Sequence, residues 1–363
     1  MNTRMLSIIA VGAMLLTAFA AVDASAEDAG FDITDDTGTT IHYDGAAEHI
    51  ILNGTGAVLT VADAGAVDKI VGVDKYATYE YTGYEQLKDL NAVDLGSFYG
   101  ETNHDYIYTS ILNLVSEGRF SQHDTIILTG YTSNEILKDM LNEAGFDHVL
   151  VWMTQNIVDY DDIVQFVSDV SLIATGEESA SIQDMQSKID SVKSYVANVA
   201  GDEKPKALSV WYSSSSGLMV NNVGIASSML ELCGADNIGF VDNGQSRYGD
   251  DLTVINLLGE NPGTVIFLPS SWSSAGKTVD DFREEYLGGS TDYTIVQMGA
   301  LWNNYCPESA DGLLEMAEAL YGENITETTD NGSDNSMLLW AVAIVAAIII
   351  VAAAYVAFKR THA

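Results

Sequence analysis

The chain has 363 residues, with 52 acidic and 15 basic side chains, a formal net charge of −37 and 47% hydrophobic residues. This hydrophobic content excludes a disordered chain, and the strong negative charge excludes nucleic acid as a partner, because its phosphates would be repelled. Two cysteines, Cys233 and Cys306, are too few for a structural zinc site or an iron–sulfur cluster. In an exported protein they are candidates for one disulfide.

The first 26 residues are typical of a secretory signal peptide. Arg4 supplies the positive start, residues 5–21 form an apolar run, and Ala24 to Ala26 offer the small residues of a cleavage site. A retained membrane helix is the alternative, but the small residues before Glu27 favour removal. The sequence therefore predicts an exported protein.

The other end of the chain predicts a membrane anchor. Residues 337–358 form an uncharged apolar run long enough to cross a bilayer, and the basic tail at 359–363 is expected in the cytoplasm. Before the run, residues 323–336 form a polar stalk in which Asn324 and Asn331 begin glycosylation sequons. We expect a single-pass protein of the cell membrane with its ectodomain outside the cell.

Residues 27–176 predict an N-terminal α/β lobe. Residues 31–43 carry a turn between two short alternating runs, the pattern of a hairpin. Strands are then expected at 49–52, 69–73, 125–128 and 149–153, and helices from 53 to 66 and at 107–117, 136–144 and 159–174. This alternation predicts a mainly parallel sheet with helices on both faces.

The first turn from strand to helix carries two glycines, Gly54 and Gly56, in the run Asn53-Gly-Thr-Gly-Ala. The spacing partly matches a dinucleotide-binding fingerprint, but Leu59 stands where the third glycine belongs. We interpret the run as a tight strand-to-helix turn.

Residues 177–200 predict one long helix. Its apolar side chains recur at steps of three and four residues, which is the period of one helical face: Ile182, Met185, Ile189, Val192, Val196 and Val199. Such a helix spans roughly 33 Å, about the diameter of a small domain. It is either a surface helix within one large domain or a spine between two lobes, and we favour the spine.

Residues 201–322 predict a second α/β lobe, because the alternating pattern restarts after the spine. Strands are expected at 206–212, 238–241, 264–268 and 294–298, and helices at 224–233, 251–258, 278–286 and 309–321. The serine-rich stretch from Ser213 to Asn222 is expected to be a loop.

Aromatic side chains follow the strands of both lobes, where ligands of open α/β sheets bind. Two facing lobes would therefore enclose an aromatic cleft. Each residue alone is more often part of a core, and it is their recurrence at strand ends that favours a site. Arg247 is the best-placed cation for a polar or anionic ligand group. The candidate ligand-binding residues are Tyr76, Tyr79, Tyr131, Trp152, Trp211, Tyr212, Arg247, Tyr248, Trp272 and Trp302.

Catalytic and metal-binding patterns find little support in this sequence. The serine run at Ser213 to Ser216 has no nucleophile elbow around it. The histidines between the two ends show no metal-ligand spacing and all fall in the first half: His42, His49, His104, His123 and His148. We expect no catalytic residue, no resident metal and no cofactor, and hence no enzyme.

Several spaced patterns resemble one family. They are KALSVWYSSSSGLMVNNVGIASSMLELCGADNI, INLLGENPGTVIF and LWNNYCPESADGLLEMAEALYGE in the second lobe, with the central helix and KIVGVDKY in the first. Together they resemble the helical-backbone (class III) substrate-binding proteins of ABC importers, over residues 33–321. The resemblance implies two α/β lobes joined by one rigid helix, an aromatic cleft, and a ferric siderophore, haem or cobalamin as ligand.

The resemblance also implies a docking contact with the permease. In this family a glutamate near the start of a helix in each lobe meets arginines of the permease. Glu135 matches this position in the first lobe, whereas Ile255 stands at it in the second lobe. Asp250 and Asp251 are the alternatives there.

We therefore predict a monomeric, membrane-tethered receptor that captures a bulky metal chelate and delivers it to an ABC permease. Only Arg119, Arg247 and Arg283 lie between the two ends, which favours a neutral hydroxamate complex, a corrinoid or haem over a tri-anionic chelate. Two rivals remain: a cell-envelope interaction protein with a vestigial cleft, and a receptor for a bare metal cation.

Overall fold

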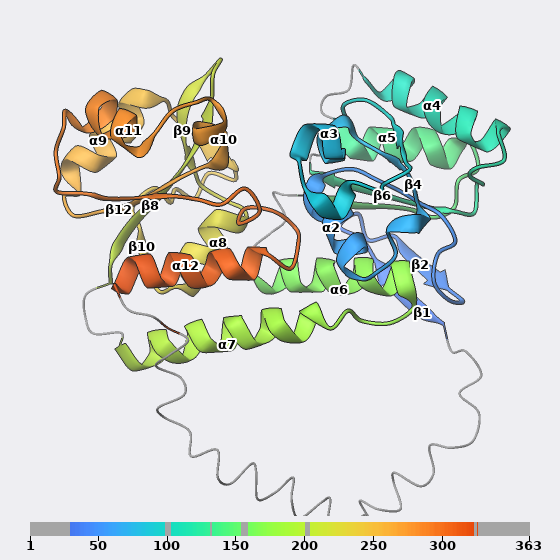
Figure 1. Cartoon of the computed structure of the whole chain (residues 1–363), viewed down its shortest axis with the longest axis horizontal. Coiled ribbons are helices and arrows are strands. Elements are labelled where there is room, and N and C mark those ends of the chain that lie inside the picture. The colour runs from blue at the N-terminus through green and yellow to red at the C-terminus, as the bar shows by residue number, and fades with distance from the viewer. Residues whose placement is uncertain are drawn as a thin grey trace, which may run out of the picture.

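The computed structural model describes residues 30–98, 103–130, 133–153, 159–199, 204–322 and Ile325. It contains two α/β lobes with mainly parallel sheets, as predicted, which stand side by side above a layer of long helices (Figure 1). The predicted signal peptide, stalk, membrane helix and tail lie outside the described residues. Among the residues described, no helix is long and apolar enough to cross a membrane.

The sheet of the first lobe is entirely parallel, in the order β5-β4-β3-β6-β7. Its strands are β3 (Ile50–Leu52), β4 (Ile70–Val73), β5 (Val93–Asp94), β6 (Thr125–Gly130) and β7 (Val149–Met153). Its main helices are α2 (Thr55–Asp63), α4 (His104–Ser116), α5 (Ser133–Glu143) and α6 (Asp161–Thr175). Ile50 and Leu52 pack in the core with α2 and α6, whereas Ile51 packs with α4 and α5. This alternation confirms that helices cover both faces.

The predicted hairpin forms from β1 (Phe31–Thr34) and β2 (Thr40–Tyr43), and its turn covers the edge strand β7. The backbone amide of Asp36 donates to the Val151 carbonyl at 3.0 Å, and the Val151 amide donates to Asp35 Oδ2 at 2.9 Å. Lys138 Nζ in α5 lies 2.6 Å from the same Asp35 oxygen, with both side chains almost fully buried. The hairpin thus satisfies an exposed sheet edge and is fixed by a buried ion pair.

The sheet of the second lobe is mixed, in the order β11-β9-β8-β12-β13, with β10 also paired to β8. Its strands are β8 (Lys206–Ser213), β9 (Gly217–Asn221), β10 (Asp236–Asn237), β11 (Arg247–Tyr248), β12 (Val265–Leu268) and β13 (Thr294–Gln297). β9 runs antiparallel to β8, so the expected serine-rich loop is largely a strand.

The same hairpin explains why the strand expected at 238–241 is wrong. β10 pairs in parallel with the first two residues of β8, Lys206 and Ala207. From Val210 onward, β9 occupies that edge of β8. The Ile238 amide still donates to the Ala207 carbonyl of β8 at 3.1 Å, but the chain turns away after it, so residues 239–241 do not extend the strand.

The helices of the second lobe also form two layers. Its helices are α8 (Ile225–Leu232), α9 (Asp251–Glu260), α10 (Ser270–Ser274), α11 (Val279–Leu287) and α12 (Ser309–Tyr321). Buried residues of α8 and α12 belong to the core that also contains the first lobe's α2 and α6. Buried residues of α9, α10 and α11 form a separate core on the outer face of the sheet.

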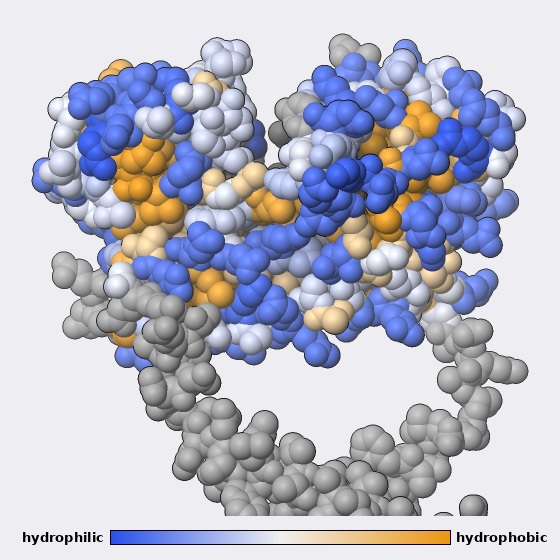
Figure 2. Space-filling view, in the orientation of Figure 1, coloured by the Kyte–Doolittle hydropathy of each residue, from blue (hydrophilic) through white to orange (hydrophobic). Residues whose placement is uncertain are grey.

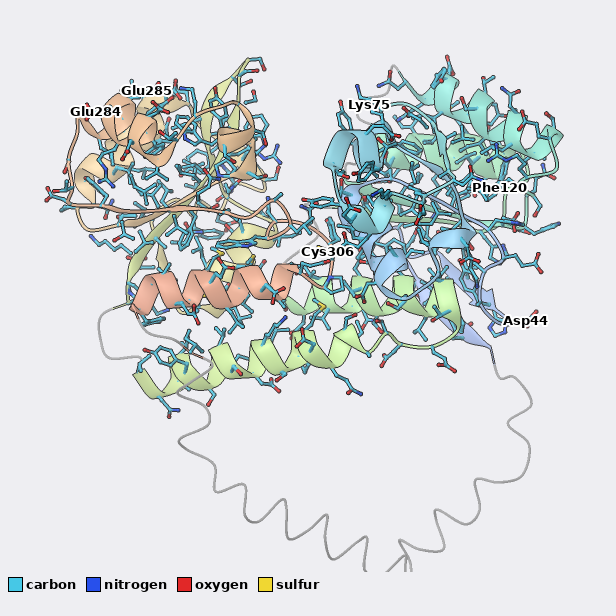
Figure 3. All side chains as sticks on the ribbon, viewed as in Figure 1. Asp44, Lys75, Phe120, Glu284, Glu285 and Cys306 are labelled. Atoms are coloured by element: carbon cyan, nitrogen blue, oxygen red, sulfur yellow. The ribbon has the colours of Figure 1, made fainter. Side chains whose placement is uncertain are left out.

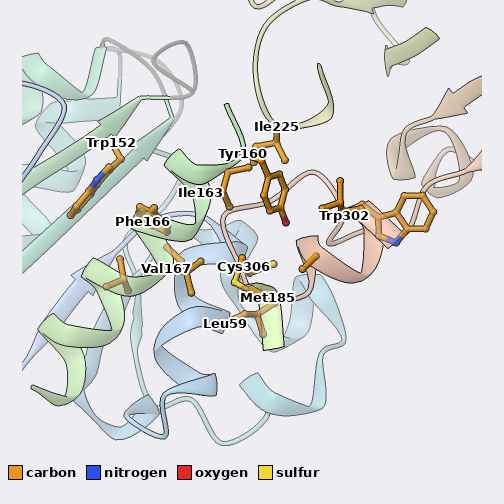
Figure 4. Close-up of a cluster of buried hydrophobic side chains, with 14 of the residues drawn as sticks. Leu59, Trp152, Tyr160, Ile163, Phe166, Val167, Met185, Ile225, Trp302 and Cys306 are labelled. Atoms are coloured by element: carbon orange, nitrogen blue, oxygen red, sulfur yellow. The ribbon is translucent and has the colours of Figure 1, made fainter. Parts of the chain in front are cut away.

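The long helix α7 (Ser181–Val199) follows α6 and leads to β8. It packs against α6 of the first lobe and α12 of the second. Met185, Ile189, Val192 and Tyr195 are buried, whereas Val199 at the helix end is 42% exposed, so Tyr195 replaces it on the predicted apolar face. One continuous apolar core runs through both lobes around these helices (Figure 4).

Candidate functional site

A notch separates the upper parts of the two lobes, on the side away from α7 (Figures 1 and 2). At its base the lobes are in direct contact. A Cβ atom added to Gly56 in α2 would lie 2.8 Å from the Tyr305 amide nitrogen, and Thr60 Oγ1 donates to the Tyr305 carbonyl at 3.1 Å. Gly56 therefore permits the close contact between the lobes. Since β3 ends at Leu52 and α2 begins at Thr55, the predicted tight strand-to-helix turn is confirmed.

On the second lobe, two predicted ligand-binding residues meet. Trp211 lies near the end of β8 and is paired with Met219 of β9. Asn221 is two residues further along β9, on the same face of the sheet as Met219, and it is paired with Arg247 of β11. The Arg247 guanidinium carbon lies 4.6 Å from the centre of the Trp211 ring, and both side chains are partly exposed. This is a cation–π contact on one face of the antiparallel extension.

A small recess of about 20 Å³ lies beside Arg247 at the start of α8. Asn303 Oδ1 accepts a hydrogen bond from the Ala226 amide at 3.2 Å, and Asn303 lies two residues before the interlobe contact at Tyr305. Arg247 therefore lies near the base of the notch. Sequence reasoning missed Asn303 and the recess because neither carries a local pattern.

On the first lobe, Tyr76 and Tyr79 lie on the segment after β4 and are both partly exposed. Tyr79 lines a pocket of about 320 Å³, and its hydroxyl donates to Glu85 Oε1 at 3.3 Å. Lys75 Nζ lies 4.7 Å from the centre of the Tyr76 ring, and Figure 3 shows Lys75 on the side of the lobe that borders the notch. Tyr131 lies outside the described residues.

One titratable group under this segment is strongly perturbed. Asp74, directly after β4, is fully buried, and burial raises its carboxyl pKa to about 6. The neighbouring carboxylate of Asp94 raises this pKa further, while nearby backbone amides lower it. Neither carboxyl oxygen of Asp74 completes a hydrogen bond within the described residues. This carboxyl group is therefore costly to ionise.

Three predicted ligand-binding residues belong to cores instead. Trp272 is fully buried, donates from Nε1 to the Thr278 carbonyl at 2.8 Å, and meets the Tyr212 ring edge-on at 4.9 Å. Tyr212 is on the opposite face of β8 from Trp211, so it points into the outer core. Trp302 is buried against Gly312 of α12, where there is no room for a side chain. In the structure these three side chains therefore pack in cores rather than in the wall of the notch.

The remaining two candidates, Tyr248 and Trp152, are partly or largely buried and lie outside the contact between Trp211 and Arg247. Tyr248 is partly buried, its hydroxyl donates to the Gly239 carbonyl at 2.8 Å, and burial raises its pKa. Trp152 lies at the end of β7, is 7% exposed, and meets Phe166 edge-on at 5.2 Å (Figure 4). Trp152 lines a separate pocket on the first lobe rather than the wall that contains Arg247.

The predicted docking residues lie at the starts of two helices. Glu135 is in the first turn of α5, next to Ile136, which is 44% exposed. Asp250 caps α9 by accepting a hydrogen bond from the Thr253 amide at 2.9 Å. Asp251 Oδ1 accepts from the Leu218 amide at 2.7 Å. Both second-lobe candidates therefore already have a structural contact.

Among the described residues, the two cysteines form no disulfide, and the histidines form no metal-binding cluster. Cys233 and Cys306 are free, buried thiols of the central core, not a disulfide, and burial raises the pKa of both well above the usual value. Each thiol donates to a backbone carbonyl, of Leu313 and Leu301 respectively. Within the described ranges, no three histidine, cysteine or acidic side chains are placed to share a metal ion.

Solved structures show the same architecture. The chain is similar to CeuE of Helicobacter pylori with Ni(II) bound, with a TM-score of 0.59 and 15% identity over 81% of this chain and 90% of that one. The fold is that of the class III periplasmic binding proteins. The periplasmic vitamin B12 binding protein BtuF of Vibrio cholerae has a TM-score of 0.55 and 20% identity, over 76% of this chain and 97% of its own.

A third similar structure is the periplasmic heme-binding protein RhuT from Roseiflexus sp. RS-1, in its apo form. It has a TM-score of 0.53 and 14% identity, over 76% of this chain and 99% of its own. No protein-family profile matches the sequence, and no curated protein matches it either. The three-dimensional comparison therefore establishes the class III fold, while the ligand has to be argued from this chain's own residues.

Proposed function

We propose that this protein is a non-enzymatic substrate-binding protein of an ABC importer, which captures a bulky metal chelate in the notch between its lobes. The observation that carries the proposal is the contact between Trp211 and Arg247 near the base of the notch. Proteins with the same fold are named for binding haem, vitamin B12 or Ni(II), which supports a ferric siderophore, haem or corrinoid ligand.

Binding would rest on apolar burial and stacking, with Arg247 fixing the orientation of the ligand. The Trp211 ring offers a flat apolar face, and the guanidinium offers directed donors for a carbonyl, carboxylate or phosphate oxygen. Arg247 makes no ion pair with any described carboxylate, although the chain carries 52 acidic residues. Its donors are therefore available to a ligand.

Delivery to a permease would use the helix starts that face outward from the two lobes. Glu135 in α5, with Asp250 and Asp251 at the start of α9, supplies acidic side chains for this contact. Exposed aliphatic neighbours, Ile136 and Leu252, lie beside them. The predicted C-terminal membrane helix would keep the receptor close to its permease at the cell surface.

The test is a titration of tryptophan fluorescence in the ectodomain from Glu27 to Ser336 with cobalamin, a ferric hydroxamate and haem, using dye controls for absorption. We expect saturable quenching by one of them. Trp211→Ala and Arg247→Met should each weaken that binding by roughly tenfold, because each removes a contact worth about 1–2 kcal/mol.

Arg119→Met is the matched control, because Arg119 is exposed and pairs with Glu117 on the first lobe. It should leave the affinity unchanged. Silence from all three ligands in a folded sample would contradict the proposal and favour the cell-envelope rival.

A further inference from the structure

A second pocket, of about 140 Å³, lies on the first lobe and is completed by Tyr305 of the second. It shares no residue with the recess beside Arg247. Four parts of the chain surround it: the β1–β2 hairpin, the end of β7, α6 and the loop before α12. The lining residues are Thr34, Asp36, Trp152, Met153, Asp162, Gln165, Phe166, Asp169 and Tyr305.

The lining combines aromatic rings with carboxylates, and none of its described residues is a lysine, arginine or histidine. Trp152 and Phe166 are buried at its floor, and the Tyr305 ring lies 4.9 Å from the Phe166 ring. Asp36 and Asp162 are exposed at the rim. Negative charge beside aromatic faces is the arrangement that stabilises an organic cation.

Asp169 is a buried carboxylate of this pocket that has no cationic partner among the described residues. Asp169 on α6 is only 7% exposed, and its single hydrogen bond among the described residues comes from Gln165 Nε2 to Oδ1, at 2.7 Å. Among the described residues, no donor bonds its second oxygen and no cation pairs with it. Burial raises the carboxyl pKa to about 6, although the hydrogen bond from Gln165 lowers it. A buried carboxylate without a cation is costly, and a positively charged ligand would remove that cost.

We propose that this pocket binds a small organic cation of the methylated-ammonium class. A bare metal ion fits less well, because no three acidic side chains of the described residues are close enough to share one ion. The pocket volume and the three rings suit a larger, weakly hydrated cation. Because Tyr305 belongs to the second lobe, such a ligand would also contact both lobes.

The test is isothermal titration calorimetry of the full chain with tetramethylammonium, and with Na⁺ and Ca²⁺ at matched ionic strength. We expect saturable one-site binding of tetramethylammonium and weaker, non-saturating heats for both metal ions. Asp169→Asn should weaken the binding at least tenfold, and Trp152→Leu should weaken it severalfold.

The matched control is Asp161→Asn, which removes an exposed carboxylate from the same helix, paired there with Lys193. It should change the affinity less than twofold, which separates a specific site from general attraction to an acidic chain. Trp211→Ala should leave this binding unchanged, so failure of the chelate proposal would be distinguishable. Absence of saturation, equal affinity in Asp169→Asn, or tighter binding of Ca²⁺ than of tetramethylammonium would overturn the inference.

Discussion

The two lobes share one layered architecture but are stabilised differently. Among the described residues, the buried acidic and basic side chains all belong to the first lobe: Asp35, Asp74, His104, Lys138 and Asp169. The buried polar residues of the second lobe are neutral amides and hydroxyls: Ser209, Asn221, Asn222, Ser228, Thr264 and Ser309. The outer core of the second lobe is instead built on aromatic rings around Trp272.

This difference follows from how each sheet ends. The first sheet stays parallel, and a hairpin with charged groups covers its edge strand β7. The second sheet continues through two strands: β9 pairs antiparallel with β8, and β11 pairs antiparallel with β9. This extension brings Trp211 and Arg247 together. The contact that we propose for ligand binding therefore arises from the irregular part of the fold, where the two lobes differ.

The largest effect should come from the aromatic core. Trp272→Ala should lower the free energy of unfolding by about 4 kcal/mol, because it leaves a large cavity among Tyr212, Phe282 and Tyr286. Urea unfolding followed by circular dichroism measures this. Trp211→Ala in β8 is the control and should cost less than about 1 kcal/mol, because its ring is partly exposed. Equal losses of unfolding free energy in the two variants would contradict the assignment of Trp272 to the core and Trp211 to the notch.

The buried ion pair of the first lobe should come next. Lys138→Met should cost about 3 kcal/mol, because it leaves the Asp35 carboxylate buried without its cation. The pKa of Asp35 lies below its usual value despite burial, owing to hydrogen bonds from Lys138, Thr37 and Val151.

The control for the ion pair is Lys88→Met, which breaks an exposed pair with Glu85. It should cost less than about 0.5 kcal/mol in the same urea experiment. A cost for Lys138→Met as small as that of the control would show that the hairpin does not depend on the pair.

Asp74 should make the first lobe less stable as pH rises, whereas a carboxylate paired with a cation makes a protein less stable as pH falls. Its folded-state pKa, about 6, lies above the ordinary value of 3.8, so its stabilising contribution is present below pH 3.8 and lost as pH rises through about 6. Asp74→Asn should therefore be more stable than the wild type at pH 7 by about 3 kcal/mol, and this advantage should disappear near pH 4. Urea unfolding across this range tests it, and a pH-independent difference would contradict it.

The smallest effects should come from two helix caps in the second lobe. Asp250 and Thr278 cap α9 and α11, whereas α8, α10 and α12 of the same lobe begin without a side-chain cap. Asp250→Ala and Thr278→Ala should each cost about 1 kcal/mol.

Asp250→Asn and Thr278→Ser keep a capping oxygen and serve as the matched controls. Both should unfold close to the wild-type urea midpoint. If the alanine variants and their controls behave alike, the capping boxes contribute nothing measurable to the second lobe.

The sequence by itself determined the layered α/β architecture. A short apolar run such as Ile50, Ile51 and Leu52 predicts a strand that is buried on both faces, because this pattern is local. The structure places neighbouring residues of the run in different cores. The same holds for the long helix α7, whose buried face follows the spacing of Met185 and Ile189. These features depend only on residues a few positions apart.

Tertiary structure alone decided which residues line a site. Trp211 and Trp272 both follow or end a strand, yet one is partly exposed beside Arg247 and the other is fully buried, because the face of the sheet depends on distant partners. The strand β9, the contact of Tyr305 with Gly56 and the isolated charge of Asp169 also arise from segments far apart in the chain. The local pattern of apolar residues predicts which face of a helix or strand is buried. Pairing between segments far apart in the chain decides which side chains remain accessible to a ligand.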